Sequence, residues 1–232
     1  MTWIAERLKA VLLLMLALAS SAKGQKLVCP ESGERGNYSK LSVRLCWQRD
    51  EIRHLKIWSP DHSVLLAVDG ESGQLYKNGI PFGEKFGFLP DAEWLWSPDS
   101  RATILTSFVT YPTQVIAGVD LLNGTSEEVD VMRSIQEDFA SRHPGLPCSG
   151  AVNVAGLTWL RGSKEAVLIA EIPASPRCEK ADGYFEGYVV SVPQGKIMRH
   201  YSMRQTAAEF RNLLGPSLLE DIKSQQEEHE GK

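Results

Sequence analysis

Five histidines are the side chains of this chain best suited to bind a metal or to act as a general base. Histidine-built zinc sites place two histidines one helical turn apart, or set histidine beside cysteine at short spacing. Neither spacing occurs, and no Gly-x-Ser-x-Gly turn, phosphate-binding loop or dinucleotide fingerprint is present. We therefore expect no metal and no cofactor, and we assign no catalytic residue. The histidines are His54, His62, His143, His200 and His229.

Aspartates that could form a catalytic carboxylate pair fall mostly in predicted turns, where side-chain to backbone hydrogen bonds account for them without catalysis. A second hypothesis stays open: the chain is a hydrolase whose serine or carboxylate, histidine and orienting acid converge only in three dimensions. A serine and an acid within hydrogen-bond reach of His54, His62 or His200 in a pocket would favour it. The aspartates are Asp61, Asp69, Asp91, Asp99 and Asp120.

Four cysteines in an exported chain predict two disulfides, because an oxidising compartment preserves them. Three pairings are possible. We favour Cys29 with Cys46 and Cys148 with Cys178, since each pair flanks a turn-rich segment. Each closed loop would stabilise the fold by about 3 kcal/mol in the chain-entropy description. No Cys-x-x-Cys is present, so we expect structural bridges rather than redox chemistry.

Residues 1–24 predict a cleaved signal peptide. Arg7 and Lys9 precede an apolar stretch over residues 10–19, which ends in the small residues Ser20, Ser21 and Ala22. The stretch is half of the roughly 20 residues that a membrane-spanning helix needs. We therefore expect a secreted or periplasmic protein with no stable membrane insertion after cleavage.

Charge excludes nucleic acid as an expected partner. The formal charge of the whole chain is −4, and removal of residues 1–24 takes away three basic residues and one acidic residue. The remaining chain is mildly acidic and has no run of Lys and Arg that could displace counterions from a polyanion.

A tetrapeptide repeat gives the strongest indication of the fold. Trp-Ser-Pro-Asp occurs at Trp58, Ser59, Pro60 and Asp61, and again at Trp96, Ser97, Pro98 and Asp99. Six to ten residues after each tryptophan comes a run typical of a strand, and the same offsets from Trp159 give a third run. Proline fixes φ near −65° and aspartate suits the next position, so a tight turn is expected. The sequence thus predicts three hairpins, with each tryptophan packing at a strand end.

These tetrapeptides resemble the Trp-Ser-Pro-Asp-Gly turns of TolB-like β-propellers, in which the motif joins two inner strands of each blade. The resemblance covers residues 55–203. It implies a mainly β fold, a small or incomplete propeller-like stack of antiparallel blades, with a β-sandwich as the alternative. His62 and Ser100 stand where the family has glycine, so another turn type is possible at both places.

The chain divides into three parts in this interpretation: a signal peptide over residues 1–24, a β-repeat domain over 25–205, and a C-terminal helix with an acidic tail over 206–232. A helical insertion is expected at about 126–147, where Val131, Ile135 and Phe139 recur every fourth residue behind an Asp130 cap. Strand candidates at 40–47 and 51–58 could complete a fourth unit from residues 26–57. Thr206 is the expected cap of the C-terminal helix.

The leading functional hypothesis is an exported binding or scaffolding module that contacts another exported or envelope protein through loops at one end of its sheets. The hydrolase described above is one alternative. The other is a structural accessory subunit of an envelope complex, whose C-terminal helix completes the assembly. Neither ligand nor partner follows from these residues.

Overall fold

The computed structural model describes residues 35–46, 54–70, 72–87, 91–108, 114–119, 121–173, 175, 177–178, 181, 183–192 and 194–230. The predicted signal peptide, Cys29 and its predicted bridge to Cys46 lie outside the described residues, as does Asp120.

Three antiparallel sheets form most of the described chain, and two of them contain only strands that are consecutive in the sequence. The first sheet contains β2 (His54–Trp58), β3 (Val64–Asp69), β4 (Ser72–Lys77) and β5 (Ile80–Gly87) in that order. The third sheet contains β10 (Asn153–Leu160), β11 (Glu165–Glu171), β12 (Phe185–Ser191) and β13 (Lys196–Tyr201) in that order.

The second sheet has the order β1-β6-β7-β8-β9 and takes its first strand from elsewhere in the chain. Its strands are β1 (Val43–Cys46), β6 (Asp91–Trp96), β7 (Thr103–Ser107), β8 (Gln114–Val119) and β9 (Glu127–Val129), and the short 3-10 helix η1 (Leu121–Asn123) precedes β9. The suggested fourth unit over residues 26–57 is therefore wrong, because β1 pairs with β6 while β2 pairs with β3.

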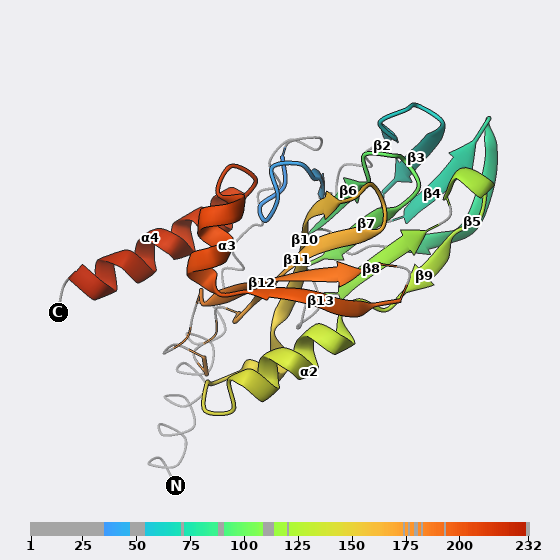
Figure 1. The fold of residues 1–232 in the computed structure, drawn as a ribbon. Helices are drawn as coiled ribbons and strands as arrows, with labels where there is room; N and C mark the ends of the chain where they lie inside the picture. The colour runs from blue at the N-terminus through green and yellow to red at the C-terminus, as the bar shows by residue number, and fades with distance from the viewer. Residues whose placement is uncertain are drawn as a thin grey trace, which may run out of the picture.

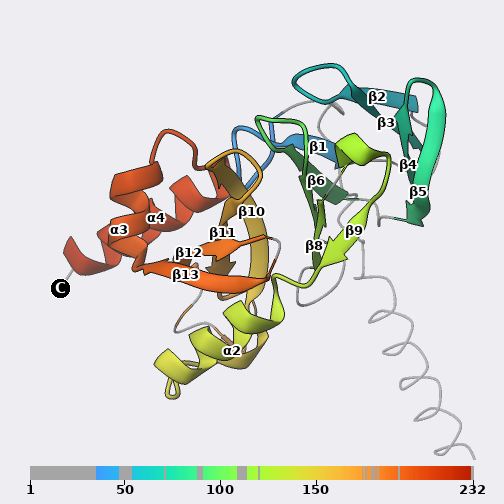
Figure 2. The ribbon, with the colours of Figure 1, turned by 45° about the vertical axis from the view of Figure 1, so that its right-hand side comes forward.

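The sheets stack face to face, and α3 (Met203–Phe210) and α4 (Pro216–Glu230) cover the far face of the third sheet (Figure 1, Figure 2). Leu66 and Trp94 belong to the core between the first and second sheets. Ile104 and Leu168 belong to the core between the second and third sheets, and Phe210 to the core between the third sheet and the helices. The fold is mainly β, as predicted, and the described residues form a stack rather than a closed ring.

Strand alternation explains how one sheet contributes to two cores. Successive side chains of a strand point to opposite faces. In β11, Ala166 and Leu168 face the second sheet, whereas Val167 and Ile169 face α3 and α4. This strand is buried on both sides, which is why it reads as a continuous apolar run instead of an alternating one.

Helix α2 (Arg133–Arg142) lies within the stretch where the sequence indicates a helical insertion, and the 3-10 helix η2 (Ser149–Ala151) follows it. Ile135 and Phe139 of α2 are fully buried in the core between the second and third sheets. Oδ1 of Asp130 accepts hydrogen bonds from the backbone N–H groups of Met132 and Arg133, both at 3.1 Å. The expected cap at Asp130 is wrong, because the N-cap position is Met132, but the Asp130 carboxylate lies two residues upstream and still accepts the N–H groups at the start of the helix.

A disulfide joins Cys148 to Cys178, with the two Cα atoms 5.7 Å apart, which confirms this predicted pairing. Cys178 is fully buried in the same core as Phe139. The bridge therefore links the segment after α2 to the loop before β12. Among the described residues, no helix is long and apolar enough to cross a membrane.

The first C-terminal helix begins earlier than the sequence predicts. Its cap is Ser202, whose hydroxyl accepts from the Gln205 N–H at 3.4 Å while the Gln205 side chain accepts from the Ser202 N–H at 2.9 Å. This reciprocal pair is a capping box. Thr206 is instead inside the helix and fully buried, and its hydroxyl donates to the carbonyl of Ser202 at 2.9 Å. The expected cap at Thr206 is wrong because the Ser-x-x-Gln pair lies four residues upstream.

Candidate functional site

The two Trp-Ser-Pro-Asp turns have the same hydrogen bonds. The Ser59 hydroxyl donates to Oδ1 of Asp61 and accepts from the Val64 N–H, and the Ser97 hydroxyl does the same with Asp99 and Ala102. His62 and Ser100 both adopt a positive φ, of 59° and 60°. The turns thus keep the left-handed position that glycine favours, and the suggested change of turn type is wrong.

Hydrogen bonds also lower the pKa of both turn aspartates, Asp61 and Asp99. Burial acts to raise the pKa of Asp61, but hydrogen bonds from Ser63, Ser100 and Ser59 outweigh it and hold the pKa well below its usual range. Burial also acts to raise the pKa of Asp99, but hydrogen bonds from Ser97, Arg101 and Ser163 outweigh it and lower that pKa. Both carboxylates are therefore occupied in structural contacts.

The three tryptophans have the same register but different surroundings. Trp58 is paired with Leu65, Trp96 with Thr103 and Trp159 with Ala166. Trp96 packs between the first and second sheets, and Trp159 lies between the second and third sheets with Nε1 3.4 Å from the Leu95 carbonyl. Trp58 keeps 48% of its surface exposed. Packing therefore accounts for Trp96 and Trp159 but leaves Trp58 unexplained.

The histidines do not meet the condition set for a hydrolase. In the described part of the chain, no serine hydroxyl is hydrogen-bonded to the imidazole of His54, His62 or His200. His54 makes an exposed pair with Asp69 at 3.3 Å, and His62 lies against the ring of Trp58 at 6.1 Å. The structure therefore brings none of these three histidines into a Ser-His-acid arrangement.

The buried carboxylate of Glu186 on β12 contacts two histidines: His200 of β13 and His143 at the end of α2. Oε2 of Glu186 lies 2.7 Å from Nε2 of His200, and Oε1 lies 3.1 Å from Nε2 of His143. The hydroxyls of Tyr184 and Tyr188 donate to the same carboxylate at 2.8 and 3.3 Å. Burial, together with the nearby Glu186 charge, raises the pKa of both tyrosines above its ordinary value. No group of histidine, cysteine or acidic side chains in the described ranges has a geometry that could hold a metal.

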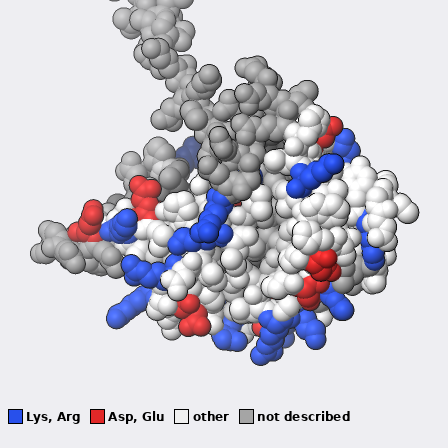
Figure 3. Space-filling model, turned by 90° about the horizontal axis from the view of Figure 1, so that it is seen from above, with Lys and Arg blue, Asp and Glu red and all other residues white. Residues whose placement is uncertain are grey.

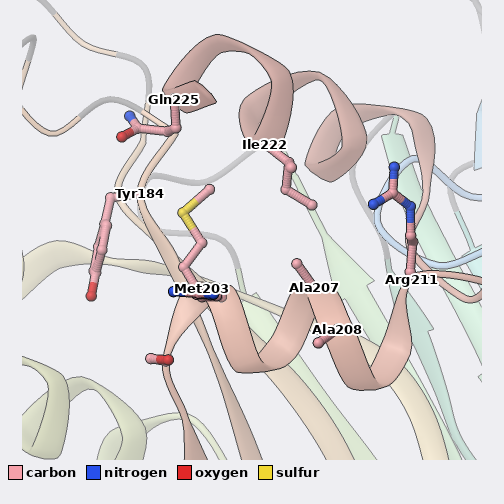
Figure 4. A pocket seen from close by; sticks show the side chains of 9 residues that line it. Tyr184, Met203, Ala207, Ala208, Arg211, Ile222 and Gln225 are labelled. Carbon is pink, nitrogen blue, oxygen red and sulfur yellow. The ribbon is translucent and has the colours of Figure 1, made fainter. Parts of the chain in front are cut away.

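A groove between α3 and α4 has a volume of about 840 Å³. In Figure 4, Ala207 and Ile222 lie on its facing sides, with Tyr184 at one end and Arg211 at the other. We call this hollow the α3–α4 groove. Its lining residues are Tyr184, Ser202, Met203, Arg204, Ala207, Ala208, Arg211, Ile222 and Gln225.

Close contact with the third sheet fixes α3 as one wall of the groove. Thr206 and Phe210 are the buried residues of α3. Gly187 on β12 allows this approach, because a Cβ there would lie 2.7 Å from the Thr206 hydroxyl. The opposite side of α3 is left to line the groove with Met203, Ala207 and Arg211, which follow one another at helical spacing.

The segment around Tyr38 fixes the start of α4, the other wall. The Gly215 N–H donates to the Tyr38 carbonyl at 2.8 Å, and the Ser217 N–H donates to the Asn37 carbonyl at 3.2 Å. Leu218, in the first turn of α4, is fully buried. Parts of the chain more than 170 residues apart in sequence therefore position the two walls relative to each other.

The groove combines an apolar interior with positive charge. In the described ranges no carboxylate pairs with the guanidinium of Arg204 or Arg211. On the face seen from above, basic and acidic side chains are interspersed (Figure 3). An apolar surface with two free guanidinium groups can take an amphipathic ligand that carries carboxylates.

Sequence reasoning did not identify this groove. The leucines of the tail do not line it: Leu213, Leu214, Leu218 and Leu219 belong to or pack against the core between the third sheet and the helices. The groove residues of α3 had one usable signal, the Met203-Ala207-Arg211 spacing, but that signal requires the helix to begin at Met203 instead of Thr206.

Comparison with known proteins gives no family for this chain. No protein-family model matches it, and no curated protein matches it. A solved structure described as "putative TolB" from Agrobacterium tumefaciens is similar over 72% of this chain, with 16% sequence identity and a TM-score of 0.35. The match covers 53% of that protein, so this chain spans about half of its length. A TM-score this low carries no argument about fold or function.

Proposed function

We propose that this chain is an exported binding module whose α3–α4 groove receives an acidic, amphipathic helix of a partner protein. Export is supported by the signal-like N-terminal sequence and by the disulfide between Cys148 and Cys178, since such bonds persist in oxidising compartments. The observation that carries the binding role is the α3–α4 groove, with its apolar walls and two arginines that pair with no carboxylate of the described residues.

Small side chains favour a helix as the ligand. Ala207 and Ala208 leave room along α3 for a third helix, while Met203 and Ile222 supply apolar contact on either side. Helix-in-groove recognition uses apolar anchors at i, i+3, i+4 and i+7 on one face of the bound helix. The expected site therefore lies on helices, whereas the sequence hypothesis placed binding in loops at one end of the sheets.

Arginine spacing indicates the charge pattern of the ligand. Arg204 and Arg211 are two helical turns apart, which is roughly 10 Å along α3. Carboxylates about two turns apart on the partner helix would meet both guanidinium groups. Each charge-assisted contact at a partly exposed site contributes on the order of 1 kcal/mol, so the apolar contact must supply most of the affinity.

The test is selection from a display library of helical peptides of about 18 residues against the disulfide-bonded protein. We expect enriched peptides to be acidic on one face and apolar on another. The Arg204→Glu/Arg211→Glu variant should weaken their binding at least about tenfold, and so should Ala207→Trp, which fills the groove. Arg101→Glu is the matched control, because Arg101 is exposed on the β6–β7 turn and does not line the groove.

Two results would contradict the proposal. One is the absence of enriched peptides from a library that contains acidic amphipathic sequences. The other is enrichment of peptides whose affinity is unchanged by both groove variants, since these peptides would bind elsewhere. Circular dichroism of each variant ensures that a loss of binding does not reflect a loss of folding.

A further inference from the structure

A second hollow, of about 310 Å³, lies among β2, β6 and β10, the first strands of the three hairpins. Each Trp-Ser-Pro-Asp turn contributes its tryptophan and its proline to the lining, the third hairpin contributes its tryptophan, and β6 adds a further one. We call this hollow the tryptophan pocket, and its aromatic and proline members are Trp58, Pro60, Trp94, Trp96, Pro98 and Trp159. The repeated motif therefore places Trp58, which core packing does not account for, at a site that all three sheets share.

The lining of the tryptophan pocket is uncharged. Its remaining members are Leu41, Val43, Leu95 and Thr158, so none of the described residues in the lining carries a charge. Thr158 supplies the one side-chain oxygen of this set, and its hydroxyl lies 3.5 Å from the Trp159 carbonyl. A charged ligand would lose hydration here without gaining an ion pair, so the pocket suits a neutral ligand.

Two buried indole N–H groups in the lining have no acceptor among the described residues. They belong to Trp94 and Trp96. Trp94 is 2% exposed, and its ring is held by stacking on Phe86 at 5.6 Å and by an edge contact with Trp96 at 5.3 Å. Trp159 differs, because its Nε1 lies 3.4 Å from the Leu95 carbonyl. A buried donor without an acceptor costs free energy, and a ligand that supplies acceptors recovers it.

Donors without side-chain acceptors select the class of ligand. The hydroxyls of a sugar and the N–H groups of an ordinary peptide are donors, and burial against this lining would leave them unpaired. A proline residue has a carbonyl acceptor, no N–H and an apolar ring. Aromatic-lined grooves bind proline-rich segments because the polyproline II helix is already extended before binding and loses little entropy.

We propose that the tryptophan pocket binds a proline-rich segment of a partner protein, whose carbonyl oxygens accept from the buried indole N–H groups. Leu41 is 52% exposed and Trp58 is 48% exposed, so both form an accessible rim, and the Trp58 ring stacks on a proline there. The volume lies at the low end of the range of about 300–1,000 Å³ for ligand pockets, so about two prolines enter it. We expect an isolated peptide to dissociate with a Kd on the order of 0.1–1 mM.

Titration of the isotope-labelled, disulfide-bonded protein with decaproline tests the proposal through the indole N–H signals in nuclear magnetic resonance spectra. The Trp96 signal, assigned by its loss in Trp96→Phe, should shift and saturate. A glycine-serine decapeptide and maltohexaose are the comparison probes, and neither should move this signal at about 5 mM.

Fluorescence anisotropy of labelled decaproline measures the affinity of each variant. Trp96→Phe keeps an aromatic ring but removes the N–H donor, and it should weaken binding about fivefold. Trp58→Ala should weaken binding by a similar factor through loss of ring stacking. Ile80→Ala is the matched control, because Ile80 is a large apolar residue that is 69% exposed and lies outside the pocket. Circular dichroism checks the folding of each variant.

A Trp96 signal that does not move with decaproline at about 5 mM overturns the proposal. An equal shift with either comparison probe overturns it as well, since the pocket would then not distinguish ligands by their donors. An affinity that is unchanged in folded Trp58→Ala and Trp96→Phe would place the peptide elsewhere. If Trp96→Phe does not fold, the rim variant Trp58→Ala decides the matter. None of these results bears on the α3–α4 groove, because the described linings of the two hollows share no residue.

Discussion

Ser163 donates its backbone N–H and its hydroxyl to Oδ2 of Asp99, at 3.1 and 3.0 Å. The other oxygen of the carboxylate, Oδ1, accepts from the Ser97 hydroxyl at 2.8 Å and from the Arg101 N–H at 3.2 Å. One side chain thus holds the turn of the second sheet closed and ties it to the turn of the third. Asp61 and Ser100 connect the first and second turns in a related way.

Asp99→Ala should lower the free energy of unfolding by about 1–3 kcal/mol, because it leaves several donors without an acceptor. Urea unfolding at pH 7 measures the change. Asp69→Ala is the control: Asp69 is 66% exposed and pairs with His54, so its loss should cost less than about 1 kcal/mol. Equal effects of the two changes would contradict the role assigned to Asp99.

The pH dependence of the same variant gives an independent check. The pKa of Asp99 is lowered in the folded state, so its stabilising contribution is present above the ordinary value of 3.8 and is lost as the pH falls below it. Wild type should therefore lose more stability than Asp99→Ala between pH 5 and pH 3.

Glu93 should make the protein less stable as the pH rises toward neutrality. Burial raises its pKa to about 7, although the Ser42 hydroxyl and the Asn37 N–H donate hydrogen bonds to the carboxylate that act in the opposite direction. Because the folded pKa exceeds the ordinary value of 4.5, the stabilising contribution of Glu93 is fully present below 4.5 and is lost as the pH rises through 7. The loss is on the order of 3 kcal/mol.

Chemical unfolding at pH 5, 6, 7 and 8 measures this slope. Glu93→Gln should flatten it, since a neutral amide can still accept the backbone N–H groups of Asn37 and Tyr38. Glu84→Gln, at an exposed position of β5, should leave the slope unchanged. A slope that persists in Glu93→Gln would assign the pH dependence to another group.

Removal of the disulfide should destabilise the fold substantially. Cys148 and Cys178 are 30 residues apart, and closure of such a loop stabilises by about 3–4 kcal/mol in the chain-entropy description. The Cys148→Ala/Cys178→Ala variant, compared with the wild type in urea, should show this difference. Non-reducing peptide mapping of the wild type checks the linkage itself. A peptide that joins Cys148 to any other cysteine would contradict it.

Gly215→Ala should displace α4 and with it one wall of the α3–α4 groove. A Cβ at Gly215 would lie 1.9 Å from the backbone carbonyl oxygen of Asn37, and backbone cannot give way as a flexible side chain can. We expect a loss of about 1–3 kcal/mol. Gly150→Ala is the control, because nothing lies within 4 Å of its added Cβ. Thermal unfolding of both variants decides the matter, and similar melting temperatures would contradict this account.

Local patterns predicted the hairpins well because a turn and the strand after it are encoded within about ten residues. Trp58, Trp96 and Trp159 each pair with the residue seven positions later in the chain, so the three hairpins have the same register. The rings of Phe86 and Trp94 stack with their centroids 5.6 Å apart between the first two sheets. Helix α2 is another local feature, since an apolar stripe and a nearby carboxylate lie within one short segment.

Features that depend on distant partners were not predictable. The strand β1 joins β6 across 45 residues, and nothing near Val43 indicates that partner. The helix cap was expected at Thr206, whereas the structure forms a capping box from Ser202 and Gln205. The environment of Glu93 likewise arises from the fold around Asn37 and Ser42, which only the tertiary structure brings to it.

By itself, the sequence determined the mainly β class and the turns with their aspartates, and it favoured the bridge between Cys148 and Cys178 among three possible pairings. Each of these follows from short-range conformational preference or from the chemistry of a few residues. The tertiary structure alone decided which sheets stack, that α3 and α4 cover one end, and that Trp58 is left exposed while Trp96 is partly buried and Trp159 is buried. The physical reason is that burial depends on what lies opposite a residue, and for this chain the opposite side comes from segments far away in the sequence.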